Sequence, residues 1–242
     1  MIKNIDRGNF KAKFDIKLNL LKIKNPSLDK FLKLLPTDTD IYIIGGFLRS
    51  INDSKYKPKD IDLIIDLNSK TLSKYIDSAF KVYEKNRMNG FKVKLSNITL
   101  DVWSLENNYA YKYSFTVYKR NPECISMSTF YNYDSISLKL NNKELFSKYY
   151  EDCIKRNTLD IVSRNRDYYF NNPKKEFLLL RAIYLRKKYN FNLSKRLTNI
   201  FVNAHTKDDH FVNHLFAQLK SEKKYQNLLR KKDIENFILS LK

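Results

Sequence analysis

Residues 40–66 read DIYIIGGFLRSINDSKYKPKDIDLIID, and this segment indicates the fold of the region around it. The apolar run at 40–44 is typical of a buried strand, and it ends at the pair Gly45-Gly46. Residues 47–52 predict a short helix after that turn, and the alternation at 60–66 predicts a second strand. A strand, a glycine turn, a short helix and a further strand together indicate an α/β organisation.

Gly45 and Gly46 stand out because the whole chain has only four glycines. Glycine accepts a positive φ and leaves room for a ligand beside the backbone. At a strand-to-helix turn the N–H groups favour a phosphate, and Arg49 supplies a cation close by. These three residues are therefore candidates for holding nucleotide phosphates. A tight turn that binds no ligand is the alternative.

Three aspartates follow in the sequence. Asp60 and Asp62 point to the same face of their strand because side chains alternate along it. Asp101 interrupts an apolar strand at 98–104, ITLDVWS, where an acid needs a partner. Neighbouring carboxylates repel each other unless a cation lies between them, and Mg²⁺ prefers such oxygens. Three carboxylates on adjacent strands can hold two metal ions, although solvated strand faces are the alternative.

The rest of the chain changes character near residue 141. Before it, the patterns predict a helix at 71–83, a hairpin of strands 91–95 and 98–104, and a short strand at 135–140. After it, amphipathic patterns predict helices at 176–188, 194–203, 208–221 and 232–241. We therefore expect an α/β part followed by an all-α part.

The net charge of +20, with 46 basic and 26 acidic residues, points to a polyanionic partner such as RNA. A lysine-rich composition produced by AT-rich coding is the alternative. The basic runs that are candidates for contacting RNA phosphates are Arg186, Lys187 and Lys188, and Arg230, Lys231 and Lys232. No apolar run is long enough for a transmembrane helix, and two cysteines are too few for a disulfide framework, so we expect a cytoplasmic protein with no membrane partner.

The segments IIGGFLRS (43–50) and DIDLIID (60–66) resemble the nucleotidyltransferase signature of the DNA polymerase β superfamily. More narrowly, they are similar to the head domain of bacterial-type CCA-adding enzymes and poly(A) polymerases. Asp101 in LDVWS stands where that family carries its third strand carboxylate. The segment LLLRAIYLRKKYNFNLS (178–194) is similar to the helix of the family's neck domain.

The resemblance implies an α/β (α+β) nucleotidyltransferase head with a small mixed sheet at residues 1–140 and an all-α neck at residues 141–242. It implies a metal-dependent transfer of NMP from an NTP, ATP or CTP, to the 3′ end of an RNA such as tRNA, with release of pyrophosphate. The catalytic and metal-binding residues that it implies are Asp60, Asp62 and Asp101, with Mg²⁺ or Mn²⁺, and the nucleotide-binding residues are Gly45, Gly46 and Arg49.

The sequence also departs from the family pattern. Ser50 replaces the aspartate that follows the arginine, and residues 174–178, KKEFL, lack the EDxxR motif that reads the incoming base. The family's body and tail domains, which grip tRNA, have no counterpart in the 242 residues. The acceptor is therefore open to alternatives: a protein or small molecule, as in nucleotidylating toxins and antibiotic-modifying enzymes, or a tRNA that is inactivated. A catalytically inactive RNA-binding module is a further alternative.

Overall fold

The computed structural model describes residues 6–52, 57–86, 88–108, 120–162 and 174–241. The chain divides into two compact units. The sheet unit comprises Lys3–Thr129 and Asp134–Glu151, and the helical unit comprises Phe130–Tyr133 and Asp152–Lys242.

The sheet unit is built on a seven-stranded mixed sheet with strand order β3-β4-β5-β2-β1-β6-β7. Its strands are β1 (Ile41–Ile44), β2 (Asp60–Ile65), β3 (Glu84–Lys85), β4 (Phe91–Lys94), β5 (Thr99–Ser104), β6 (Ser137–Lys139) and β7 (Glu144–Phe146). The pair β2 and β5 is parallel, and the other neighbours are antiparallel. The predicted mixed sheet is confirmed, and β1 and β2 lie at its centre.

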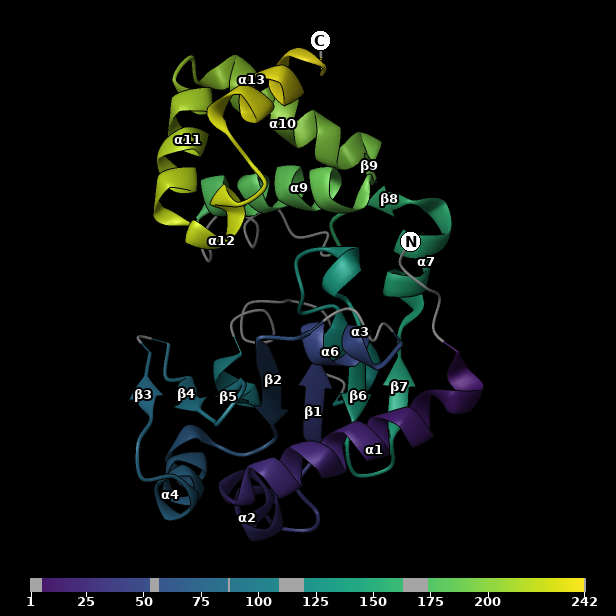
Figure 1. Ribbon diagram of the computed structural model, residues 1–242, viewed down its shortest axis with the longest axis vertical. Helices are drawn as coiled ribbons and strands as arrows, with labels where there is room; N and C mark the ends of the chain where they lie inside the picture. Colours follow the sequence, from purple (N-terminus) through teal and green to yellow (C-terminus); the bar gives the residue numbers. More distant parts are fainter. Residues whose placement is uncertain (1–5, 53–56, 87, 109–119, 163–173, 242) are drawn as a thin grey trace. The chain divides into compact units, whose positions relative to one another are not determined.

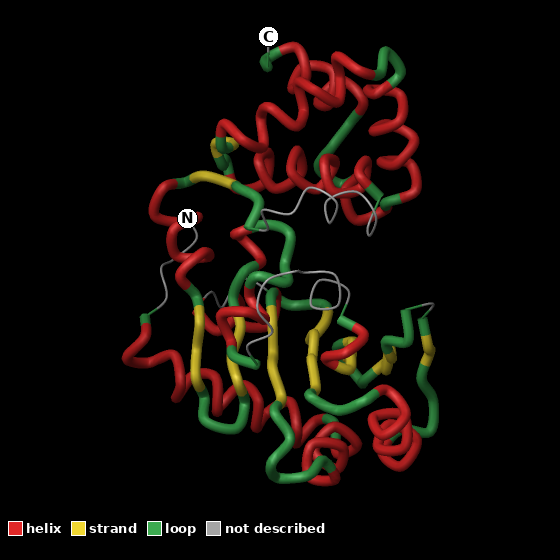
Figure 2. The backbone as a smooth tube through the Cα atoms, turned by 180° about the vertical axis from the view of Figure 1, so that it is seen from behind, coloured by secondary structure: helices red, strands yellow, loops and turns green. Residues whose placement is uncertain are grey.

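Helices cover the sheet, and the long helix α1 crosses one of its faces (Figure 1). The opposite view shows the strands in front of this helix (Figure 2). Phe10 and Phe14 of α1 are fully buried, and the Phe14 ring packs edge-on against Phe47 of α3 with centroids 6.2 Å apart. The helices of this unit are α1 (Arg7–Lys24), α2 (Pro26–Leu34), α3 (Gly46–Asn52), α4 (Ser69–Ala79) and α6 (Pro122–Ser126), with the short 3₁₀ turn η1 (Leu105–Asn107). A second 3₁₀ turn, η2 (Asn132–Asp134), spans a sequence boundary between the two units.

Helix α7 (Lys148–Arg156) spans the sequence boundary between the two units, and the helices that follow it belong to the helical unit. Its helices are α9 (Lys175–Tyr189), α10 (Lys195–Lys207), α11 (Phe211–Ser221), α12 (Lys223–Gln226) and α13 (Lys231–Leu239). Helix α9 ends because Asn190 adopts a left-handed conformation at φ 57°, and α10 begins because the Ser194 side chain accepts a hydrogen bond from Leu197 N. The four helices predicted after residue 176 are confirmed, and a short parallel pair, β8 (Thr158–Leu159) and β9 (Asn192–Leu193), accompanies them.

None of the described helices is long and apolar enough to cross a bilayer.

Candidate active site

The glycine turn joins β1 to α3 at the centre of the sheet. Gly45 has φ +70°, a left-handed conformation that side chains with a Cβ rarely adopt, and Gly46 begins α3. Gly45 N donates a hydrogen bond to Ile136 O at 3.0 Å, which ties the turn to the residue before β6. Glycine is thus required at position 45 by the backbone itself.

Replacing Gly45 by alanine should therefore destabilise the sheet unit. A Cβ at this position would lie 3.8 Å from Asp62 Oδ2 and 4.0 Å from Arg49 Nη1, so it would fit without a clash. The left-handed backbone alone costs about 1–2 kcal/mol, which corresponds to a fall in the melting temperature of roughly 2–8 °C. Calorimetry of Gly45→Ala beside Gly8→Ala, a helical position with no positive φ, measures this cost. Equal melting temperatures for the two variants would contradict it.

The sheet brings the predicted aspartates onto one face. Asp62 pairs in register with Asp101 across the parallel strands β2 and β5, so their side chains project from the same side. Asp60 lies two residues before Asp62 and is exposed at the start of β2. On the other side of β2, Asp62 pairs with Ile44, the last residue of β1 before the glycine turn.

The electrostatics show that these carboxylates are close enough to affect one another. Burial, together with the negative charges of Asp60 and Asp101, raises the pKa of Asp62 to about 8, while Arg49 opposes the rise. Burial also raises the pKa of the Asp101 carboxyl, and Lys92 opposes it. Negative charge thus accumulates at this point of the sheet, where a hard cation with oxygen ligands would offset it.

The aspartates are not gathered around one point, however. Lys92 of β4 places its Nζ 3.7 Å from Asp101 Oδ1, on the strand next to β5. Within the described ranges, no group of three or more His, Cys, Asp and Glu side chains could hold a metal ion as it stands. Carboxylate oxygens remain the donors that Mg²⁺ and Mn²⁺ prefer, so the residue types at this site fit such a cation.

Arg49 is buried, with 8% of its surface exposed, in the last turn of α3. Its Nη1 lies 2.9 Å from Asp134 Oδ1, at the end of the turn η2. Nothing local in the sequence marks Asp134, because only the tertiary fold brings it to Arg49. Lys92 is not marked by the sequence either, because the alternating pattern of β4 indicates only that Lys92 is on the exposed face of its strand.

Ser50, where the family resemblance leads one to expect an aspartate, has a structural role. Its hydroxyl donates to Phe47 O within α3 and accepts a hydrogen bond from Lys17 Nζ at 2.7 Å. Lys17 also donates to the Ser50 carbonyl oxygen at 3.0 Å. Ser50 therefore fastens α3 to α1.

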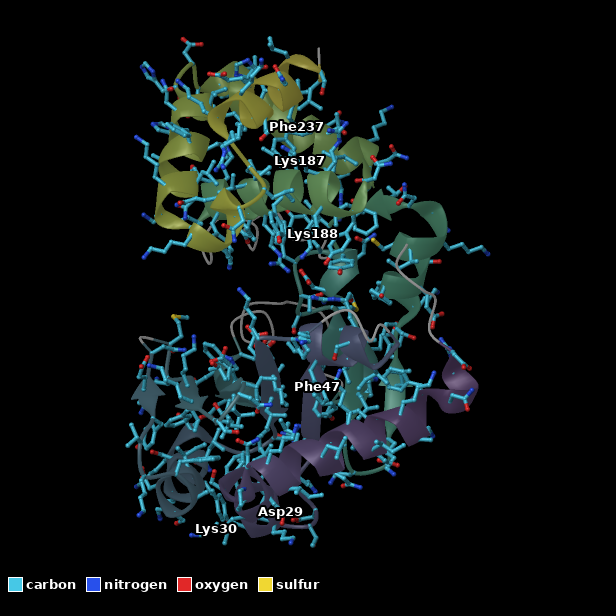
Figure 3. All side chains as sticks on the ribbon, viewed as in Figure 1. Asp29, Lys30, Phe47, Lys187, Lys188 and Phe237 are labelled. Carbon is cyan, nitrogen blue, oxygen red and sulfur yellow. The ribbon has the colours of Figure 1, made fainter. Side chains whose placement is uncertain are left out.

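The two predicted basic runs lie on α9 and at the start of α13, in the helical unit. Lys187 Nζ pairs with Asp233 Oδ1 at 2.6 Å, and Arg186 lies over the Phe237 ring, so both face α13. Lys188 instead lies over the rings of Tyr184 and Tyr189 on the other side of α9 (Figure 3). The remaining cations are Arg230, which is the N-cap residue of α13, and Lys231 and Lys232 in its first turn.

The fold is similar to solved structures of CCA-adding enzymes. A CCA-adding enzyme with ATP matches with a TM-score of 0.62 and 15% identity, covering 99% of this chain and 55% of that chain. A Thermotoga maritima CCA-adding enzyme complexed with tRNA matches with a TM-score of 0.61 and 16% identity, covering 99% and 52%. A CCA-adding enzyme with CTP matches with a TM-score of 0.60 and 17% identity, covering 91% and 49%.

No protein-family model and no curated protein matches the sequence. The chain spans about half the length of the solved structures above. At this low identity the similarity is one of fold, and it covers the mixed sheet and the helices that follow it. The chain has the fold of the CCA-adding nucleotidyltransferases over about half of their length.

Proposed function

We propose that this protein is a metal-dependent nucleotidyltransferase that adds NMP from an NTP to the 3′ end of an RNA such as tRNA. The observation that carries the proposal is the register of Asp62 against Asp101, beside the Gly45 turn and with Asp60 on the same strand. The solved structures of similar fold include complexes with CTP, ATP and tRNA, which supports these substrate classes. In this proposal the sheet unit is the catalytic head and the helical unit is the neck.

The reaction joins the 3′ oxygen of the acceptor to the α-phosphorus of the NTP and breaks the bond to the β-phosphate, so pyrophosphate leaves. Gly45, Gly46 and Arg49 would hold the triphosphate: Gly45 leaves room beside the backbone, Gly46 stands at the N-terminus of α3, and the arginine offers positive charge. The raised pKa of Asp101 suits it to accept the proton of the attacking hydroxyl.

A divalent cation, Mg²⁺ or Mn²⁺, held by Asp60, Asp62 and Asp101 would supply Lewis-acid charge for the triphosphate. The Asp62 carboxyl suits such a site because burial and two neighbouring carboxylates leave its negative charge poorly compensated. The chain then contributes mainly position and charge, which is the usual way in which enzymes catalyse phosphoryl and nucleotidyl transfer.

Removal of divalent cations should abolish the reaction. Each α-labelled NTP is incubated with the protein, total cellular RNA and total cellular protein, in Mg²⁺, in Mn²⁺ or in excess EDTA. We expect label in an RNA band with ATP or CTP, and a loss of at least about 10³-fold in EDTA, since metal charge contributes several kcal/mol. Restoring Mg²⁺ after the EDTA treatment is the control for irreversible damage.

The other outcomes discriminate between the proposal and its alternatives. Label in a protein band would contradict the RNA acceptor and support a protein-modifying transferase. Undiminished labelling in EDTA would contradict the metal dependence. The absence of label in every arm would contradict the enzyme and favour a binding module.

A further inference from the structure

A pocket of about 410 Å³ lies within the helical unit, between α9 and α13. Each helix contributes four residues at the spacing i, i+3, i+4 and i+7, which is one face of a helix. The lining residues are Ile183, Arg186 and Lys187 of α9 with its C-cap residue Asn190, and Asp233, Asn236 and Phe237 of α13 with its C-cap residue Ser240. The volume falls within the roughly 300–1,000 Å³ of small-molecule pockets.

The floor of the pocket is apolar and its rim is polar. Ile183 and Phe237 are 3% and 4% exposed, whereas Asn190, Asn236 and Ser240 are exposed. The amides and the hydroxyl offer both donors and acceptors of hydrogen bonds around a ring surface. A ligand that matches this pocket therefore carries polar groups around a flat or apolar centre.

Arg186 forms the cationic side of the pocket. Its guanidinium carbon lies 5.3 Å from the centre of the Phe237 ring, in the geometry of a cation–π contact. Lys187 and Phe237 are seen together between the two helices in Figure 3. A guanidinium group stacked on a ring keeps its N–H edge for a phosphate, and its outer plane can stack on a base.

The charge of the pocket is positive after its internal ion pair is counted. Lys187 pairs with Asp233 at 2.6 Å, and Asp233 Oδ2 also accepts a hydrogen bond from Arg230 N at 2.7 Å. Burial by itself would raise the pKa of Asp233, but these hydrogen bonds lower it below its ordinary value. The Asp233 carboxylate is thus paired with Lys187 of α9 and with the backbone at the start of α13. The positive charge of Arg186 is therefore the one that can attract an anion.

We propose that this pocket binds one nucleotide of an RNA strand, with the phosphate against Arg186 and the base beside Arg186 and Phe237. The inference extends the proposed function, on which it rests for the identity of the anion as RNA. Arg230, Lys231 and Lys232 stand at the start of α13, the helix that forms one side of the pocket, and Lys231 pairs with Glu235 at 3.6 Å. A free inorganic anion would use the cation but would leave the ring and the amides without a role.

The test measures RNA binding by the full chain with fluorescence anisotropy. The probe is a fluorescein-labelled single-stranded RNA 12-mer, and a 12-mer with abasic sugars carries the same charge without bases. The variants are Arg186→Ala and Phe237→Leu, the second of which keeps an apolar floor. Lys207→Ala is the matched control, because Lys207 is an exposed cation at the end of α10 and does not line the pocket.

We expect Arg186→Ala to weaken binding of the RNA 12-mer about 10-fold, which is the usual effect of removing one stacking contact. It should also reduce the slope of log K against log salt by about 0.7, the value for one phosphate on a single strand. Phe237→Leu should weaken binding of the RNA 12-mer but leave binding of the abasic 12-mer unchanged. Lys207→Ala should change the affinity for either 12-mer less than about 2-fold, because it removes a single exposed charge.

Equal effects of Arg186→Ala and Lys207→Ala would overturn the proposal, because binding would then follow net charge alone. Equal affinity of the wild-type protein for the two 12-mers would overturn the base contact. Nucleotidyl transfer is assayed on the same preparations. If the wild-type protein binds RNA through Arg186 but transfers no nucleotide, the pocket is supported and the proposed function fails.

Discussion

Replacing Asp62 by asparagine is expected to abolish nucleotidyl transfer and to make the protein more stable in the absence of divalent cations. Loss of transfer should reach about 10³-fold or more, because the variant removes several kcal/mol of charge stabilisation at the metal site. The gain in stability follows from the raised pKa of Asp62, whose charge is disfavoured by burial and by Asp60 and Asp101. One substitution thus separates activity from stability.

The pH dependence gives the sign of the stability effect. In the unfolded chain an aspartate titrates near ~3.9, whereas Asp62 in the folded protein titrates at about 8. Between these values the folded state binds more protons, so the metal-free wild-type protein loses stability as the pH rises through this window. The advantage of Asp62→Asn should therefore grow from pH 5 to pH 8, and be worth a few degrees of melting temperature.

Melting curves in EDTA at pH 5 and pH 8, together with transfer assays in Mg²⁺, measure both effects. Asp38→Asn is the matched control, because Asp38 is an exposed aspartate in the turn before β1. We expect it to change neither activity nor stability appreciably. An Asp62→Asn variant that is less stable than the wild-type protein at pH 8 would contradict the electrostatic account of the site.

Arg49→Ala is expected to abolish transfer as well, but with the opposite effect on stability. Arg49 is buried and pairs with Asp134 at 2.9 Å, and it opposes the rise in the pKa of Asp62. Removing one partner of a buried ion pair leaves the other charge uncompensated and costs about 3–5 kcal/mol. The melting temperature should fall by roughly 10 °C.

Arg7→Ala is the matched control for this variant. Arg7 pairs with Glu151 at 3.2 Å in an exposed position, where an ion pair contributes about 1 kcal/mol or less. Denaturant unfolding of both variants gives the two free energies. If Arg49→Ala is no more destabilising than Arg7→Ala, the buried pair with Asp134 does not contribute the expected free energy of unfolding.

The central strands could be predicted from the sequence because their signals are local. The apolar run before Gly45 and the alternation around Asp62 fix which faces are buried, and the structure confirms both strands. What the sequence could not supply is the pairing of β2 with β5, which sets Asp62 against Asp101. Asp134 and Lys92 escaped prediction for the same reason, since each meets its partner only through the tertiary fold.

The sequence pattern predicts a helix at 71–83, whereas the helix in the structure begins and ends earlier. Helix α4 spans Ser69–Ala79, because the Asn68 side chain caps it by accepting from Thr71 N. Phe80 leaves the helix in an extended conformation and packs its ring 5.3 Å from that of Phe31. A tertiary contact therefore ended a pattern that local periodicity would have continued.

The sequence pattern does not predict helix α1, because apolar residues lie on more than one side of it. Phe10 and Phe14 are buried on one side, while Ile16, Leu20 and Ile23 are 62%, 53% and 75% exposed on another. Apolar residues on opposite sides blur the 3.6-residue period on which a sequence-based prediction depends. By contrast, the buried residues Leu178, Leu179 and Leu180 of α9 begin the segment that resembles the family's neck helix. The bounds predicted for that helix agree with the structure to within one residue at each end.

We expect the aspartates on β2 and β5 to catalyse transfer of NMP to an RNA 3′ end, and pyrophosphate release measured beside label incorporation is the sharpest test of this role. Wild-type protein and Asp62→Asn are incubated with α-labelled ATP or CTP, total tRNA and Mg²⁺. The wild-type protein should release one pyrophosphate for each labelled nucleotide at the RNA 3′ end, and the variant should give neither product. Incorporation that is the same for both proteins would contradict it.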